Sequence, residues 1–236
     1  MRSATVVVRT THVAFARVGG ELVALHGPGA EPFPFSIVVP ERDVASLPAE
    51  GPLRLGDGVV VLPGGRRLAA RRPAAAQAGP PGVDATIMLR ALGAVPGLAA
   101  RSAAAGSLDD PERLLGRGQG LTPSGDDVLI GFIAMCAHAH RGWGLPDPAP
   151  LAAGLAARAP RRTTAVSAAL LAEAARGRFA PVVGAVCRAG PADLASALAR
   201  LAAVGATSGL DTLAGIERAC RATSPALRAR APASPG

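Results

Sequence analysis

Residues 122–135, TPSGDDVLIGFIAM, contain the segment that most strongly indicates the fold. Apolar side chains from Val128 to Met135 fall on every side of a helix, a pattern typical of a helix buried at the centre of a bundle. A hydroxyl residue followed by proline, as in Thr122-Pro123, is typical of a helix N-terminus. We therefore predict a central helix over 123–141 whose N-terminus opens into the interior or into a cleft.

The loop before this helix is rich in glycine. Residues 116–127, GRGQGLTPSGDD, place four glycines and two adjacent aspartates at the helix start. Free N–H groups and the positive end of the helix dipole favour phosphate or carboxylate there, and we expect Gly118 and Gly120 to need positive φ or to lack room for a side chain. The loop is neither a Walker loop nor the dinucleotide-binding fingerprint. The alternative is structural: the glycines turn the chain, and Asp126 and Asp127 complement the helix dipole.

The same motif occurs a second time. Residues 208–215, SGLDTLAG, agree with residues 124–131, SGDDVLIG, at five of eight positions. Each copy has an aspartate in the first turn and a glycine four residues later, which predicts two helices that cross at Gly131 and Gly215 with their N-termini at one end. We expect Asp127 and Asp211 to lie within about 10 Å of each other and to supply negative charge between the two positive helix ends. Coincidence in a chain rich in alanine, glycine and leucine is the alternative.

A third helix start carries hydroxyls beside arginines. In RRTTAVSAALL, residues 161–171, Arg161 and Arg162 precede Thr163 and Thr164. Guanidinium groups beside helix N–H groups and hydroxyls suit an oxyanion, so we expect at least one of the two arginines to point toward residues 118–125. A capped helix with two solvated arginines is the alternative.

The composition changes along the chain. Up to residue 72 the segments are short and rich in valine, and the Gly-Gly pairs of VGGELVA and LPGGRRL indicate hairpins. We predict a β-rich N-terminal domain over 1–72, a linker over 71–82, a helical domain over 83–222 and a flexible tail over 223–236. The fold class is then α+β, with a small antiparallel sheet or barrel followed by a larger all-helical bundle. The expected helices span 83–93, 110–115, 123–141, 149–158, 163–176, 179–188, 191–204 and 208–222.

Charge and hydropathy narrow the classes of partner. The net charge is +8, but every basic side chain is an arginine, the arginines are scattered, and aromatic residues are only 3%, so the nucleic-acid-binding class is disfavoured. The longest apolar stretch, Val128 to Ala139, is well short of the roughly 20 residues that span a bilayer. Arg9 and His12 interrupt the N-terminus before a signal peptide could form, and Cys136, Cys187 and Cys220 form no CxxC pair. We expect a cytoplasmic protein that binds neither nucleic acid nor membrane.

Three segments, in order, carry a family resemblance: GRGQGLTPSGDDVLIGF, RTTAVSAALLAEAARG and VGATSGLDTLAGI. Together with the β-rich start they resemble a bacterial family described as a domain of unknown function. One branch of that family is described as a subunit of the oxamate carbamoyltransferase of allantoin degradation, a part of purine catabolism. The resemblance extends from about His12 to about residue 220. It implies transfer of a carbamoyl group between oxalurate and phosphate, giving oxamate and carbamoyl phosphate, in an assembly with two other kinds of subunit.

We interpret the chain as a subunit of such a carbamoyltransferase, binding small anionic substrates at residues 116–127. The reaction holds two anions together and stabilises an oxyanion. The candidate catalytic residues are Asp126, Asp127 and Asp211. The candidate substrate-binding residues are Gly118, Gly120, Thr122, Ser124, Gly125, Arg161, Arg162, Thr163, Thr164, Ser208 and Gly209.

Two alternatives stay open at this point. The sequence identifies no cofactor with certainty, but a Mg²⁺ that accompanies a phosphate would use Asp127 and Asp211 as ligands. The chain could instead be a non-catalytic scaffold whose helical domain binds the other protein subunits, with the motifs serving as structural turns.

Overall fold

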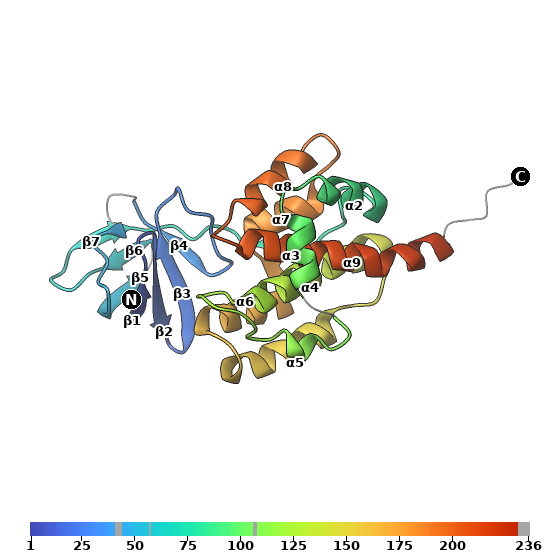
Figure 1. Cartoon of the computed structure of the whole chain (residues 1–236). Coiled ribbons are helices and arrows are strands. Elements are labelled where there is room, and N and C mark those ends of the chain that lie inside the picture. Colours follow the sequence, from blue (N-terminus) through green and yellow to red (C-terminus); the bar gives the residue numbers. More distant parts are fainter. Residues whose placement is uncertain (41–43, 57, 106–107, 231–236) are drawn as a thin grey trace, which may run out of the picture. The chain divides into compact units, whose positions relative to one another are not determined.

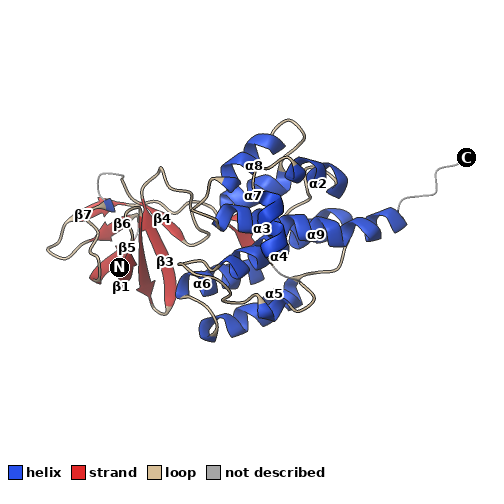
Figure 2. Ribbon diagram, in the orientation of Figure 1, coloured by secondary structure: helices blue, strands red, loops and turns tan. Residues whose placement is uncertain are grey.

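The computed structural model describes residues 1–236 except 41–43, 57, 106–107 and 231–236 (Figure 1). It divides into two compact units, Met1–Ala75 and Ala76–Gly236. The first holds a seven-stranded sheet and the second holds most of the helices (Figure 2). An α+β fold with an N-terminal sheet is thus confirmed, and the ranges predicted as domains, 1–72 and 83–222, lie inside these units.

One curled sheet makes up the N-terminal unit. Its strands are β1 (Arg2–Arg9), β2 (Val13–Val18), β3 (Glu21–His26), β4 (Ser36–Val38), β5 (Gly51–Gly56), β6 (Val59–Val61) and β7 (Arg67–Ala69), in the order β4-β3-β2-β1-β5-β6-β7. The predicted hairpins are confirmed, because β2 pairs with β3 across one Gly-Gly and β6 with β7 across the other. A bridge between Val38 and Arg71 joins β4 to the segment that follows β7.

The sheet departs from the expected antiparallel pattern at one edge. Strand β4 pairs with β3 in parallel, with Ala24 opposite Ser36. The segment between them is too long for a tight hairpin and returns the chain in the same direction. The buried side chains of the sheet form one hydrophobic cluster, which includes Val6, Ala16, Leu25, Leu53 and Val60.

The second unit is mainly helical. Its helices are α2 (Ala85–Gly93), α3 (Leu98–Ala104), α4 (Ser124–Trp143), α5 (Ala149–Arg158), α6 (Ala165–Ala175), α7 (Pro181–Arg188), α8 (Leu194–Ala202) and α9 (Ser208–Arg230), with the 3-10 turns η1 (Pro111–Arg113) and η2 (Ala159–Arg161). Two short strands, β8 (Ala76–Gln77) and β9 (Arg178–Phe179), pair within it. The prediction of an all-helical bundle with a linker over 71–82 is therefore corrected.

The structure differs from the helix predictions in three places. Helix α3 was not expected, although its sequence LAARSAA consists mostly of strong helix formers. The expected helix over 110–115 is only the turn η1. Helix α9 runs to Arg230, past the expected end at 222, so residues 223–230 are helical. The rest of the predicted tail, 231–236, lies outside the described residues.

Among the described helices, none has the combination of length and hydropathy that a membrane span requires.

The centre of this unit is the crossing of α4 and α9. Most side chains in the first four turns of α4 are buried, which confirms the predicted central helix. A Cβ at Gly131 would lie 2.0 Å from the carbonyl oxygen of Thr212, and a Cβ at Gly215 would lie 2.0 Å from that of Val128. Thr212 and Val128 occupy equivalent places in the two copies of the motif, so the contact is reciprocal. The predicted crossing at the two glycines is confirmed.

Alanine at either crossing glycine tests this contact. We expect Gly131→Ala and Gly215→Ala to lower the free energy of unfolding by about 1–3 kcal/mol, because the added methyl group must displace backbone. Gly93→Ala is the control, since a Cβ at that helical glycine meets no atom within 4 Å. Urea unfolding measures all three. Wild-type stability of both crossing variants would show that the helices do not touch at these residues.

Candidate functional site

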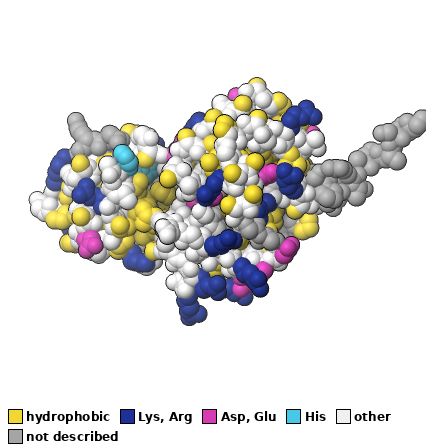
Figure 3. Space-filling model, viewed as in Figure 1, with side chains coloured by type: hydrophobic (Ala, Val, Ile, Leu, Met, Phe, Trp, Pro, Cys, Tyr) yellow, Lys and Arg dark blue, Asp and Glu magenta, His cyan; other side chains and the backbone are white. Residues whose placement is uncertain are grey.

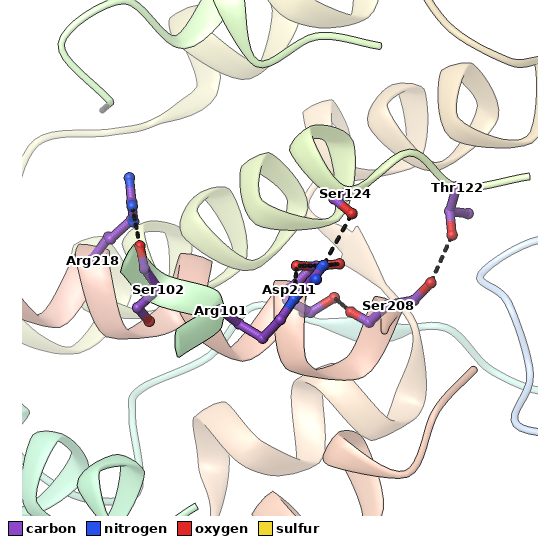
Figure 4. A network of polar contacts seen from close by, with 8 residues as sticks. Arg101, Ser102, Thr122, Ser124, Ser208, Asp211 and Arg218 are labelled. Atoms are coloured by element: carbon purple, nitrogen blue, oxygen red, sulfur yellow. Dashed lines mark hydrogen bonds and ion pairs between the residues drawn. The ribbon is translucent and has the colours of Figure 1, made fainter. Parts of the chain in front are cut away.

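The two copies of the motif begin side by side. The hydroxyl oxygens of Thr122 and Ser208 lie 2.9 Å apart, which places the start of α4 against the start of α9 (Figure 4). This confirms that both N-termini lie at one end of the crossing. We call Thr122, Ser124, Asp127, Ser208 and Asp211 the paired N-termini.

Arg101 of α3 links the paired N-termini (Figure 4). Its Nη2 donates to both carboxylate oxygens of Asp211 at 2.5 Å, and its Nε donates to Oδ1 at 2.9 Å. The same Nη2 donates to the hydroxyl oxygen of Ser124 at 3.1 Å. The side chain of Arg101 is 30% exposed and that of Asp211 only 2%, so the arginine supplies charge to a buried carboxylate and still reaches solvent.

Sequence reasoning missed Arg101. It lies in an alanine-rich segment outside every motif, and the helix that carries it was not predicted. The available signal was that Asp211, on an apolar helix, would need a cation if it were buried. That signal indicates a cation but not which of the many arginines supplies it.

Asp127 occupies the equivalent place on α4 but has different surroundings. The residue is 5% exposed, and its Oδ2 has no hydrogen-bond partner among the described residues. Burial raises the pKa of its carboxyl to about 8, although hydrogen bonds from Ser208 and Thr122 act in the opposite direction. The nearby charges of Asp211 and Asp126 raise the pKa further. These causes favour the protonated form of Asp127 near neutral pH, whereas our expectation that both aspartates supply negative charge stays a prediction.

Asp126 braces the glycine-rich loop. Its Oδ1 accepts a hydrogen bond from the backbone N–H of Gly116 at 2.8 Å, and its Oδ2 accepts one from the hydroxyl of Thr163. The Thr164 hydroxyl donates to the carbonyl oxygen of Leu121 at 2.5 Å and also caps α6. The hydroxyl-rich start of α6 thus packs on the loop, and both oxygens of Asp126 are used within the chain.

The predicted backbone geometry of the loop is confirmed. Gly118 has φ of 119° and Gly120 has φ of 95°, a region that side chains other than glycine rarely adopt. A Cβ at Gly118 would also lie 2.7 Å from the backbone nitrogen of Ser124. Residues 117–121 are exposed, so the loop is a surface feature fixed at both ends.

Two backbone donors are not free for a ligand. The N–H of Gly125 donates to the carbonyl of Arg117 at 2.8 Å, and the N–H of Gly209 donates to that of Val204 at 2.9 Å. These glycines occupy equivalent places in the two copies. The expectation of free N–H groups is therefore corrected at these two positions.

Arg161 and Arg162 lie next to the loop along the backbone. The carbonyl oxygen of Arg162 would lie 1.9 Å from a Cβ at Gly116, so the two segments touch. Both arginine side chains are exposed. Their contact with an anion stays a prediction. On the face shown in Figure 3, arginines lie in several separate groups rather than in one continuous stripe.

The paired N-termini do not fit the Mg²⁺ alternative. Among the described residues, no group of three or more His, Cys, Asp or Glu side chains gathers as metal ligands. Arg101 already places a positive charge against both oxygens of Asp211. A divalent cation prefers several oxygen ligands, commonly with negative charge, and here a guanidinium stands where it would bind.

The raised pKa of Asp127 predicts a pH-dependent stability. A carboxyl whose folded pKa lies above its unfolded pKa binds more protons in the folded state, so its contribution is full at low pH and is lost as pH rises through about 8. Between pH 5 and 8 we expect the wild-type free energy of unfolding to fall by up to about 1.4 kcal/mol per pH unit relative to Asp127→Asn.

Urea unfolding across this pH range measures the difference. Asp193→Asn, the same change at the exposed N-cap of α8, is the control and should follow the wild type. Parallel pH profiles for wild type and Asp127→Asn would show that Asp127 is ionised in the folded protein.

Comparison with known proteins gives one family. The model of the family described as oxamate carbamoyltransferase subunit AllH matches residues 114–220. This range contains both copies of the motif, the glycine-rich loop and the hydroxyl-rich start of α6, whereas Arg101 lies before it. No curated protein and no solved structure matches the chain significantly.

Proposed function

We propose that this chain, which matches the model of the family described as oxamate carbamoyltransferase subunit AllH over residues 114–220, binds a small anionic substrate at its paired N-termini. One observation carries the proposal: Arg101 joins Ser124 and Asp211 at the place where Thr122 meets Ser208. Two distant copies of one motif and a half-buried arginine therefore meet at a single point of the helical unit.

The chemistry of carbamoyl transfer suits these groups. Oxalurate and oxamate carry a carboxylate, the other substrate is a phosphate, and the transferred carbonyl develops negative charge. Arg101 offers a guanidinium that is 30% exposed, and the hydroxyls of Thr122, Ser124 and Ser208 can turn to donate. Charge-assisted hydrogen bonds of this kind are the strongest that a protein makes to an anion.

The rest of the loop would complete the site. Residues 117–121 are exposed, and Gly118 and Gly120 carry no side chain to block approach. Arg161 and Arg162, which precede the two threonines that hold this loop, would then serve the second anion. Asp126 contributes by fixing the loop through Gly116 and Thr163.

A scaffold function is the second candidate. The family description, a subunit, indicates that members assemble with other proteins. The observation that favours it is that many motif groups already bond within the chain, among them the N–H groups of Gly125 and Gly209. On this view the motifs build a rigid helical unit, and the chemistry belongs to a partner chain.

Arg101 separates the two functions. We expect Arg101→Gln to weaken binding of oxamate, phosphate or carbamoyl phosphate about tenfold or more, because a charge-assisted contact is lost. Isothermal titration calorimetry measures the affinity. Arg90→Gln, at an exposed arginine of α2, is the control and should bind as the wild type does.

Loss of Arg101 also leaves Asp211 buried without its partner, so stability must be separated from binding. The double variant Arg101→Gln/Asp211→Asn removes both charges and should unfold closer to the wild type while binding stays weak. If the wild type binds none of the three anions but still assembles with its partner subunits, the scaffold function holds and the anion site is wrong.

A further inference from the structure

Asp127 and Asp211 hold equivalent places in the two copies of the motif but have different hydrogen-bond partners. Asp211 forms an ion pair with Arg101 through both oxygens. Asp127 instead interacts with the hydroxyls of Thr122 and Ser208. The repeated sequence thus gives two first-turn carboxyls, of which one has a cation as partner and the other has neutral groups.

One carboxyl oxygen of Asp127, Oδ2, is buried without a hydrogen-bond partner among the described residues. The residue as a whole is 5% exposed. Buried polar atoms are nearly always paired, so an unpaired one indicates a ligand, a water or a functional role. This atom belongs to a side chain that reaches the start of α9 through Ser208 and lies at the point where the two N-termini meet.

The charged groups that face Asp127 add to the effect of burial in raising the pKa of its carboxyl. Asp126 lies beside it on α4, and Asp211 faces it from α9; both are acidic. Arg101 of α3 is engaged by Asp211 and by Ser124. With burial as the largest cause, these surroundings raise the pKa of Asp127 to about 8. Neighbouring carboxyls in environments this different commonly divide the roles of acid and charged group.

We propose that Asp127 binds the anionic ligand as a neutral carboxylic acid, donating the hydrogen on Oδ2 to a carboxylate or phosphoryl oxygen of that ligand. Thr122 and Ser208 orient the carboxyl, and Arg101 supplies the positive charge. The inference rests on the proposed function for the presence of an anion, and it adds which group donates and in which protonation state. It also explains how a site for anions can contain a second carboxyl: a protonated one does not repel them.

A proton and the ligand then bind together. Deprotonation of Asp127 removes a donor and places a negative charge against the anion, so affinity should fall as pH rises through the pKa of the group. By linkage the bound anion must in turn raise that pKa. Oxamate is the suitable probe, because its carboxylate stays ionised throughout the range from neutral to alkaline pH, whereas phosphate itself titrates.

The test compares four proteins by calorimetric titration with oxamate between pH 6.5 and 9.5. For the wild type we expect affinity to be constant at the lower end and to fall about tenfold per pH unit above about 8. Asp127→Asn keeps a donor of the same shape without a titrating proton, so it should bind at every pH with a nearly flat profile. Asp127→Leu removes the donor and should bind weakly at every pH. Asp193→Asn should reproduce the wild-type profile.

Each contrary outcome has one meaning. If Asp127→Asn binds as weakly as Asp127→Leu at neutral pH while both fold, a carboxylate is required and the inference is wrong, although the anion site stands. If the wild type binds no oxamate, phosphate or carbamoyl phosphate, the proposed function itself fails. Infrared difference spectra of wild type against Asp127→Asn, recorded without ligand at pH 6.5, give an independent reading: a protonated carboxyl band supports the inference, and a carboxylate band in its place overturns it.

Discussion

The contact on which the helical unit depends is the reciprocal approach of two backbones, Gly131 onto Thr212 and Gly215 onto Val128. A Cβ at either glycine would lie 2.0 Å from a carbonyl oxygen of the other helix, so neither position tolerates a side chain without displacement of backbone. Because the helices touch within the first two turns after their N-termini, the residues at their starts come within hydrogen-bonding distance, as the contact between Thr122 and Ser208 shows. The polar site is thus a consequence of close packing at the glycines.

A symmetric crossing would give two equal carboxyls, but α3 breaks the equivalence. Arg101 forms an ion pair with only one of them, Asp211. It also donates a hydrogen bond to Ser124, which belongs to the other copy of the motif. Asp127 has only the hydroxyls of Thr122 and Ser208 as partners, and its burial favours the neutral form of its carboxyl. The site therefore combines an arginine–aspartate ion pair with a second carboxyl whose burial favours the protonated form, and neither property follows from the repeated motif itself.

Sequence patterns predicted what depends on local spacing or on a motif that occurs twice. The glycines four residues after each aspartate predicted the crossing, and the Gly-Gly pairs predicted the hairpins. The parallel pairing of β4 and the β8–β9 ladder were beyond reach, because both join segments whose proximity is set by the tertiary fold. For the same reason Arg101 was missed, and the raised pKa of Asp127 could not be inferred without knowing that the residue is buried.

The family match begins at residue 114, whereas the ion pair of Asp211 is completed by Arg101, 110 positions earlier in the chain. A carboxylate that is only 2% exposed is strongly unfavourable without a cation or a proton. The matched residues 114–220 therefore do not by themselves explain the charge at the site, because Arg101 lies in the segment that precedes them. An aspartate buried to this degree needs an arginine or lysine from elsewhere in the chain or must hold its carboxyl protonated, which is the form that burial favours for Asp127 on the other helix.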